Sequence, residues 1–458
     1  MIGIARMLER GRSRRERVRG RLMAAGAALA TFLLCAAANL TAFEIDEHHD
    51  YYSVFTDGMM RPGTMTALVL LTAPALAFVY QVSRLAAATR QRRLAALRLA
   101  GATPGETRLL GAYETGRSAL LGALAGAAVY LPVNLAAQWI FNERVSPLPV
   151  PYVPGAGSSV PAVPLPLVAA AIVLVTAGGV LSGLAAGRHV VASPLEVVRR
   201  ARLTRPRALD LLLVVAGAGL VFAGFNVVEM DPIWRSGVYV IGAGACVLVF
   251  GLVLATTWVI RAAARSAGRR AGSAETLLSA RMVEADPRAW ARALSVVGLT
   301  VFLGSAAGWA QTFVLFDVWS VSTFRMVIYV LVDLALLGAM VTSAAALVVH
   351  QAEELLDHRR SFASLAASGV PIASLGRVLT RQALIAALPV CLVAGAAGVA
   401  ALSWISFSAT PTTAWAYVYP FLRAAVVTAL GVAAAVLVSR AARPVLRRAA
   451  APGELRFE

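Results

Sequence analysis

Side chains that could carry out chemistry are few in this chain of 458 residues, and none forms a catalytic arrangement. A nucleotide site of the usual kind needs a lysine that reaches the β- and γ-phosphates, and all 42 basic residues of this chain are arginines. The sequence also lacks a nucleophile elbow, a His pair at metal-ligand spacing and, in the segments expected to be cytoplasmic, a His/Asp cluster. We therefore expect no catalytic residue, no metal site and no cofactor bound by this chain, which predicts that it is not an enzyme.

Two other sets of ionisable residues could bind ions. His48 and His49 lie within the acidic segment 44–50, whose composition suits a hard metal or a proton sensor, although a solvated acidic loop explains it better. Asp333 lies within an apolar run, where an ionisable side chain indicates a function. Because it lies in the outer third of its predicted helix, snorkelling or a hydrogen bond to a neighbouring helix explains it equally well.

A repeated segment is the most informative feature of the chain. Residues 92–114 read RRLAALRLAGATPGETRLLGAYE, and a fainter copy, RRSFASLAASGVPIASLGRVLTRQ, occupies residues 359–382. The segments align without a gap and pair Leu97 with Leu365, Gly101 with Gly369, Ala102 with Val370, and Glu114 with Gln382. Each copy lies between two apolar runs, so we infer an internal duplication.

Local patterns in the first copy predict a helix–turn–helix. Leucines supply an apolar side and arginines a polar side, and residues 101–105 interrupt the helical pattern with turn chemistry. Thr103 is the expected N-cap of a helix that starts at Pro104. Such a lever can enter a groove on a partner. An ordinary amphipathic interfacial loop is the alternative, and the presence of two aligned copies disfavours it.

A second, shorter repeat precedes the first apolar run of each half. Residues 5–9 (ARMLE) recur as residues 280–284 (ARMVE). Both segments have the pattern of amphipathic helices that lie in the membrane interface, with arginines toward the headgroups. The residues expected to face the acyl chains are Ile4, Met7 and Leu8 in the first copy and Leu277, Leu278 and Met282 in the second.

Composition places the chain among membrane proteins. It is 59% hydrophobic and 14% charged, with a mean hydropathy of +0.72. Apolar runs of about 20 residues, the length that crosses a bilayer, recur along it, and each should be a helix because backbone groups in lipid must pair within the segment. The all-α prediction comprises ten spans, at roughly 22–43, 65–86, 114–140, 165–187, 208–229, 237–261, 291–315, 326–349, 382–406 and 417–439.

Charge and small residues refine this topology. The net charge of +18 follows the positive-inside rule, since arginines crowd the N-terminus, the loops 84–108, 188–207, 261–292 and 359–381, and the C-terminal tail. Both termini should therefore be cytoplasmic, and binding to nucleic acid is not expected. We expect Trp309, Trp319 and Trp415 in the interfacial aromatic belt. Close helix packing is expected at Gly122, Gly126, Gly178, Gly179 and Gly183.

The repeated segment resembles the cytoplasmic signature of the FtsX-like (MacB-type) permeases of ABC transporters, in which an arginine-flanked LRxxGAT helix precedes a glutamate that opens the next span. The short repeat is similar to the elbow helices of that family. The resemblance implies two four-span repeats, residues 1–207 and 263–458, joined by a two-span linker at 208–262. This plan resembles the permeases of bacitracin-resistance exporters but lacks their large extracellular domain, because only about ten residues around 316–325 separate the seventh and eighth spans.

The resemblance also implies a function and a set of coupling residues. The chain would be a permease in a bacterial plasma membrane that exports a lipophilic or amphipathic compound, such as a peptide antibiotic. A separate ABC ATPase, present in two copies, would bind ATP and magnesium. The residues expected to couple to it are Arg93, Leu97, Arg98, Gly101, Ala102, Thr103, Glu106, Arg108 and Glu114, with Leu365, Gly369, Val370 and Pro371. The second copy lacks the arginine at Ala366 and the glutamate at Gln382, so we expect it to couple less strongly.

Two other classes of function fit the sequence. One is a signal transmitter that does not transport and that activates a cell-wall enzyme through an extracytoplasmic partner. The other is an ion-coupled secondary transporter, a class that also uses duplicated halves. The near absence of charged residues at mid-membrane disfavours the second class, because proton or sodium coupling needs ligands there.

Overall fold

The computed structural model describes residues 14–42, 60–84, 103–144, 164–191, 209–230, 235–316, 323–402, 414–444 and 446. The regular structure in these ranges is entirely helical, in agreement with the all-α prediction. The chain divides into two compact units, residues 1–203 and 204–458. The predicted division into two repeats and a linker stays a prediction.

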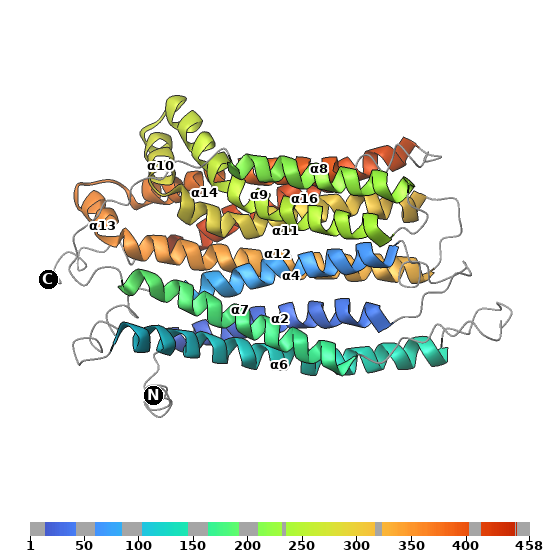
Figure 1. The fold of residues 1–458 in the computed structure, drawn as a ribbon. Helices are drawn as coiled ribbons and strands as arrows, with labels where there is room; N and C mark the ends of the chain where they lie inside the picture. Colours follow the sequence, from blue (N-terminus) through green and yellow to red (C-terminus); the bar gives the residue numbers. More distant parts are fainter. Residues whose placement is uncertain are drawn as a thin grey trace. The chain divides into compact units, whose positions relative to one another are not determined.

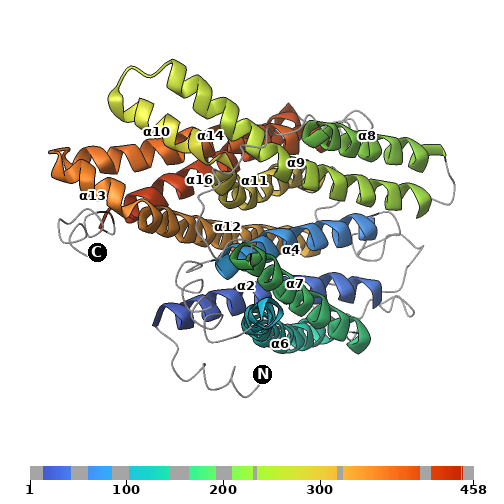
Figure 2. The same ribbon diagram turned by 60° about the vertical axis from the view of Figure 1, so that its left-hand side comes forward.

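Unit 1 is a group of four long helices (Figure 2). They are α2 (Arg14–Asn39, followed by the 3-10 turn η1, Leu40–Ala42), α4 (Met60–Arg84), α6 (Pro104–Arg144) and α7 (Leu165–Val191). Helix α2 packs against the other three, and α7 also packs against α4 and α6.

Small residues let the helices of unit 1 approach backbone to backbone. A Cβ added at Gly122 or Gly126 of α6 would lie 2.2 Å from the carbonyl oxygen of Ala24 or Ala28 of α2, respectively. The constant offset between the paired positions shows that α2 and α6 run parallel. Two of the predicted α7 glycines, Gly179 and Gly183, are equally close to α6, whereas Gly178 has only an ordinary contact with α4. The prediction of close packing is confirmed at these positions except Gly178.

Unit 2 begins with an antiparallel hairpin of α8 (Leu209–Met230) and α9 (Arg235–Arg269). Glycines alternate across this hairpin, since Gly217 lies against Leu248, and Gly244 against Val221, with added Cβ positions 2.3 and 2.6 Å from backbone nitrogens. The short helix α10 (Ala274–Ala285) follows and packs against α9 and α14. Helix α9 also packs against α11 and α14.

The other helices of unit 2 repeat the packing of unit 1. They are α11 (Pro287–Phe316), α12 (Thr323–Asp357), α13 (Arg359–Ala367), α14 (Ile372–Leu402) and α16 (Ala414–Ala441). Helix α11 packs against α12, α14 and α16, and α16 packs against α12 and α14, so these four long helices pair as α2, α4, α6 and α7 do. The order of the corresponding helices along the chain is also the same, which is the arrangement that a duplication would produce.

Eight helices in the described ranges are long and apolar enough to cross a membrane, so the chain is a polytopic α-helical membrane protein. All ten predicted spans fall on helices. In two of these helices, α4 and α8, the residues that are described in full form apolar stretches of 10 to 17 residues, Leu71–Tyr80 and Leu212–Gly224. The count of ten spans stays a prediction.

The tryptophans behave differently from one another. Trp415 is exposed, as expected of a residue in an aromatic belt. The prediction for Trp309 is wrong, because this side chain is buried and its indole N–H donates to the carbonyl of Val399 at 3.0 Å. A buried indole needs such an acceptor, and α14 supplies it. Trp319 lies outside the described residues.

Candidate functional site

The second copy of the repeated segment, residues 359–382, forms a helix–turn–helix. In Figures 1 and 2, α13 and α10 lie at the same end of unit 2, which we call the arginine-rich end and which comprises residues 261–292, 359–381 and 440–444. Helix α13 ends in a Schellman turn, in which the N–H groups of Gly369 and Val370 donate to the carbonyls of Ala366 and Leu365, each at 3.1 Å. Gly369 has φ +93°, a left-handed conformation that favours glycine.

An apolar cluster fixes the base of this turn. Its buried members come from α12, α13, α14 and the end of the C-terminal helix, and they are Leu355, Phe362, Leu375, Leu379 and Leu446. Leu365 and Val370 pack against the cluster, which explains why these two positions of the segment are apolar. Residues 367–369 and 371–373, including Pro371, are exposed. The segment therefore has a fixed base and an exposed apex.

Met282 joins the same cluster, so the prediction that it faces acyl chains is wrong. Its sulfur accepts a hydrogen bond from Nε2 of Gln382 at 3.0 Å, and the Gln382 side chain is fully buried. Leu277 and Leu278 are exposed, as predicted for the apolar side of an interfacial helix. Helix α10 thus has one exposed apolar side and packs its other side onto the base of the coupling segment. Ile4, Met7 and Leu8 lie outside the described residues.

Ion pairs hold α10 against α14. The carboxylate of Glu275 lies 2.7 Å from Nη2 of Arg377 and 3.0 Å from Nη1 of Arg381. Nη1 of Arg381 also donates to the hydroxyl of Ser273, the N-cap of α10, at 2.6 Å. The hydrogen bond from Arg377 is the largest cause of the lowered pKa of Glu275, and the charges of both arginines contribute. A displacement of α14 would therefore carry α10 with it.

One ion pair links α10 to α9, because Glu284 accepts from Nε of Arg265 at 3.2 Å. Glu284 also accepts from Nη1 of Arg281, on α10 itself, at 2.9 Å. The α10 helix is thus tied to α9 on one side and to α14 on the other. All these contacts lie at the arginine-rich end.

The first copy of the repeated segment, residues 92–114, is described only from Thr103 onward. Helix α6 begins at Pro104, the position aligned with Ile372 at the start of α14. Thr103 caps this helix, as predicted, because its N–H donates to Glu106 Oε2 at 2.8 Å and its hydroxyl accepts from the Glu106 N–H at 3.3 Å. These hydrogen bonds lower the pKa of Glu106. Arg108 lies on α6, and Arg93, Leu97, Arg98, Gly101 and Ala102 lie outside the described residues.

Glu114, whose partner the sequence could not identify, lies beside Arg19. Its Oε2 is 3.8 Å from Nη2 of Arg19, and both side chains are largely buried between α2 and α6. If the alignment of the two short repeats is continued without a gap, Arg19 pairs with Leu294, which is fully buried in α11. The second copy thus replaces both the arginine and the glutamate of this pair by uncharged residues, Leu294 and Gln382.

Asp333 belongs to a polar network inside unit 2. Its Oδ1 accepts from Nε2 of Gln311 at 3.1 Å and forms an ion pair with Nη2 of Arg423. Gln311 Oε1 accepts from Tyr419 at 2.7 Å and from Nη1 of Arg423. The network joins α11, α12 and α16. Of the two explanations that the sequence allowed for Asp333, the structure shows the hydrogen bond to a neighbouring helix.

Arg423 is the residue of this network that the sequence interpretation missed. It lies in the apolar run of α16, nine positions after the first residue of the helix, and its own sequence context, PFLRAAVV, was a sufficient signal. The expectation that charged residues are nearly absent at mid-membrane took no account of Arg423, and it stays a prediction. An arginine and an aspartate on different spans are expected to pair, because each is unfavourable alone in hydrocarbon.

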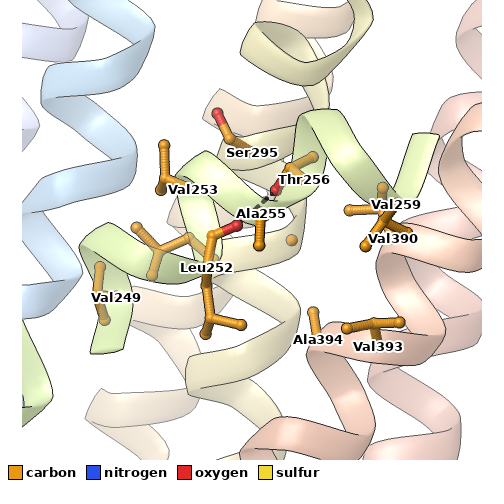
Figure 3. Close-up of a pocket in the computed structure, with 12 residues that line it drawn as sticks. Val249, Leu252, Val253, Ala255, Thr256, Val259, Ser295, Val390, Val393 and Ala394 are labelled. Carbon is orange, nitrogen blue, oxygen red and sulfur yellow. Dashed lines mark hydrogen bonds between the residues drawn. The ribbon is translucent and has the colours of Figure 1, made fainter. Parts of the chain in front are cut away.

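A small apolar cleft of about 30 Å³ lies where α9 meets α11 and α14 (Figure 3). Its residues are Val249, Leu252, Val253, Ala255, Thr256 and Val259 of α9, Ser295, Gly298 and Leu299 of α11, and Val390, Val393 and Ala394 of α14. The hydroxyls of Thr256 and Ser295 donate to carbonyls of their own helices, at 2.8 and 3.0 Å. The walls therefore offer an apolar surface to whatever enters.

Metal binding finds no support in the part of the chain that the structure describes, since no group of three or more His, Cys, Asp or Glu side chains there is placed to hold an ion. The acidic segment with His48 and His49 lies outside that part. Comparison with protein-family models, with curated proteins and with solved structures finds no match to this chain.

Proposed function

We propose that this chain is the membrane-spanning permease subunit of an ABC transporter of the FtsX-like type. The observation that carries the proposal is the helix–turn–helix at residues 359–382, which has an exposed apex, a fixed apolar base and ion pairs to α10. Such a lever transmits a push on its apex to α9, α10 and α14 together. The helix of the first copy starts at the aligned position and is capped at Thr103, which supports a lever in each half.

The energy for transport would come from another polypeptide. The chain contains no lysine, so it has no P-loop lysine to reach a nucleotide phosphate. Two levers imply two ATPase subunits, one for each half. The positive-inside rule assigns the arginine-rich segments to the cytoplasm, where these subunits would bind. ATP and magnesium would bind to those subunits. The apolar spans favour a lipophilic or amphipathic cargo, and export of a peptide antibiotic is the specific case that we propose.

Purification of the partner tests this function. We expect the tagged chain, extracted from bacterial membranes in mild detergent, to retain an ABC ATPase that mass spectrometry identifies and whose activity rises when both are placed in nanodiscs. Recovery of a cell-wall hydrolase with an ATPase that moves no cargo would favour the signal transmitter. Recovery of no ATPase, even after crosslinking in intact cells, would contradict the proposal.

Variants of the turn test the lever itself. Gly369→Val should weaken stimulation of the ATPase, because a β-branched residue strains the left-handed conformation, at roughly 1–2 kcal/mol. Gly369→Asn is the matched control, since asparagine tolerates this conformation and no atom lies within 4 Å of an added Cβ. We expect Gly101→Leu and Arg98→Glu to reduce stimulation more than changes in the second copy. Equal stimulation in Gly369→Val and Gly369→Asn would show that the turn geometry has no role in coupling.

A further inference from the structure

The Asp333–Arg423 pair is buried unequally at its two ends. The side chain of Arg423 is 13% exposed, whereas that of Asp333 is 49% exposed. Arg423 directs its donors into the unit: Nε to the carbonyl of Gly304 at 2.9 Å, Nη1 to Gln311 and Nη2 to Asp333. The positive end of the pair is thus enclosed, and the negative end lies at the surface of unit 2.

The hydrogen bonds fix the carboxylate in this position. Gln311 is 2% exposed and receives hydrogen bonds from Tyr419 and Arg423 on its oxygen, which orients its amide nitrogen toward Asp333. Both bonds to Asp333 end on Oδ1. The carboxylate is therefore held by a network that spans three helices, and half of its side-chain surface stays accessible.

The surface around Asp333 is apolar. Val330, Leu334 and Leu337 of α12 are each more than 60% exposed. Asp333 follows Thr323, the first residue of α12, by ten positions, or about 15 Å along the helix axis, and so lies near the end of unit 2 opposite the arginine-rich end. A carboxylate exposed to hydrocarbon is unfavourable, and a cation placed on it would offset this penalty.

We propose that Asp333 is the polar subsite for the ammonium group of an amphipathic cation, whose apolar body lies on Val330, Leu334 and Leu337. The inference deepens the proposed function, on which it rests for the role of the cation as cargo. Charge complementarity supports it, because the exposed end of the pair is negative while the compensating arginine is enclosed. An ammonium group can come from a free amphipath or from an aminolipid headgroup.

Binding of two matched probes tests this site without the ATPase. The probes are a dansyl-labelled alkylammonium and its uncharged alcohol analogue of equal chain length, measured with the full chain in phosphatidylcholine nanodiscs and corrected for partition into empty discs. We expect the cation to bind about ten to a hundred times more tightly than the alcohol, the range for a hydrogen bond to a charged group. Equal affinity of the two probes would overturn the proposal, and this comparison needs no variant.

Variants locate the binding to Asp333. Asp333→Asn keeps an acceptor for Gln311 but removes the charge, so the cation should bind no more tightly than the alcohol. Asp333→Glu should retain the preference for the cation, and Glu16→Gln, which removes a carboxylate from the start of α2, should bind like the wild type. Wild-type affinity for the cation in Asp333→Asn would refute the assignment. Thermal melting of each variant verifies that it is folded.

The source of the ammonium group follows from the lipid. Weaker probe binding in discs that contain phosphatidylethanolamine would show that a lipid headgroup competes for the ammonium site, and unchanged binding would assign the site to a free amphipath. The two proposals fail separately. A chain that binds the cation but recovers no ATPase would refute the permease and keep the site, and the reverse result would refute only the site.

Discussion

The contact between α2 and α6 in unit 1 differs from the contact between the corresponding helices of unit 2, α11 and α14. In unit 1, Gly122 and Gly126 place the backbone of α6 directly on Ala24 and Ala28 of α2. The aligned positions in α14 are Val390 and Ala394, and both line the apolar cleft. Here the small residue is on the first span instead, since a Cβ at Gly298 of α11 would lie 3.1 Å from a methyl group of Val390.

The close approach in unit 2 lies further along the helices. A Cβ at Gly398 would lie 2.4 Å from the carbonyl oxygen of Phe302, two turns beyond Val390. Toward the arginine-rich end, α11 and α14 therefore meet through side chains and leave the cleft that α9 completes. The corresponding helices are therefore packed more tightly in unit 1 than in unit 2 at the level of the cleft. We expect α14 to move more easily at the level of the cleft than α6 does beside α2.

The polar contacts differ in the same sense. Unit 1 joins its first and third spans by Arg19 and Glu114, whereas unit 2 has Leu294 and the Gln382–Met282 contact at the aligned positions. Unit 2 instead ties its third span, α14, to α10 by ion pairs through Glu275. The residue aligned with Arg377 is Leu109, which is exposed.

The largest effect is expected where one charge is removed from a largely buried ion pair. Glu114→Gln removes the carboxylate that lies 3.8 Å from Nη2 of Arg19 and should destabilise unit 1 by about 3 kcal/mol. The thermal midpoint of the detergent-solubilised chain, followed by fluorescence-detected size exclusion, measures this change.

The double variant Arg19→Leu, Glu114→Gln sharpens the comparison, because it gives unit 1 the residues of unit 2. Since it removes both charges, it should recover most of the lost stability and lie within about 1 kcal/mol of the wild type. A double variant as unstable as the single one would show that the two units do not share this packing.

A change of glycine to alanine should have unequal effects at the α2–α6 and α11–α14 contacts. Gly126→Ala places a methyl group on the Ala28 backbone and should destabilise the chain by about 2 kcal/mol, typical of overpacking. Gly298→Ala meets a side chain that can shift, and alanine favours the helix, so the change should be less than about 1 kcal/mol. Thermal melting of both variants tests this. Equal destabilisation by the two variants would contradict the proposed difference in packing tightness between the two contacts.

The ion pairs of α10 predict a pH dependence that is specific to unit 2. Because the folded-state pKa of Glu275 is lowered from 4.5, its contribution to stability is present above pH 4.5 and is lost as the pH falls through the lowered value. Amides of α10 should then exchange hydrogen faster at low pH. In Glu275→Gln the exchange should already be fast at neutral pH and should change little on acidification, beyond the intrinsic rate. A pH profile like that of the wild type would show that another group governs α10.

The smallest effect is expected at the start of α6. Thr103→Ala removes the capping hydroxyl and should destabilise the first turn by about 1 kcal/mol, while Thr103→Ser keeps it. Hydrogen exchange of the amides of residues 105–107 provides the measurement. The second copy has Pro371 at this position and no such cap, so equal exchange in the alanine and serine variants would make the two starts alike.

Local features of the fold could be predicted from the sequence. Apolar runs of about 20 residues placed each helix, and the Thr103-Pro104-Gly105-Glu106 pattern placed a helix start to the residue, because caps depend on neighbours in sequence. The left-handed Gly369 fits the turn that its aligned partner Gly101 predicted.

Contacts between distant segments could not be predicted. The Asp333 network needs residues 311, 333 and 423 on three helices, and only their packing brings them together. The sequence pattern placed Met282 and Trp309 at the lipid, yet both side chains pack inward. Met282 contacts Gln382, and Trp309 donates to the carbonyl of Val399. Both partners are about 90 to 100 residues away along the chain, so no local pattern reveals them. The helical period shows an apolar side but not its neighbour.

The α8–α9 hairpin has a consequence for how the protein is made. Its glycines and the residues opposite them follow one antiparallel register, from Val214 with Gly251 to Gly224 with Ile241, so the hairpin can close without any other helix. Its two helices leave the ribosome before α11 and α14, which both pack on α9. We expect the hairpin to insert before the second repeat and to be the surface on which that repeat assembles during translation.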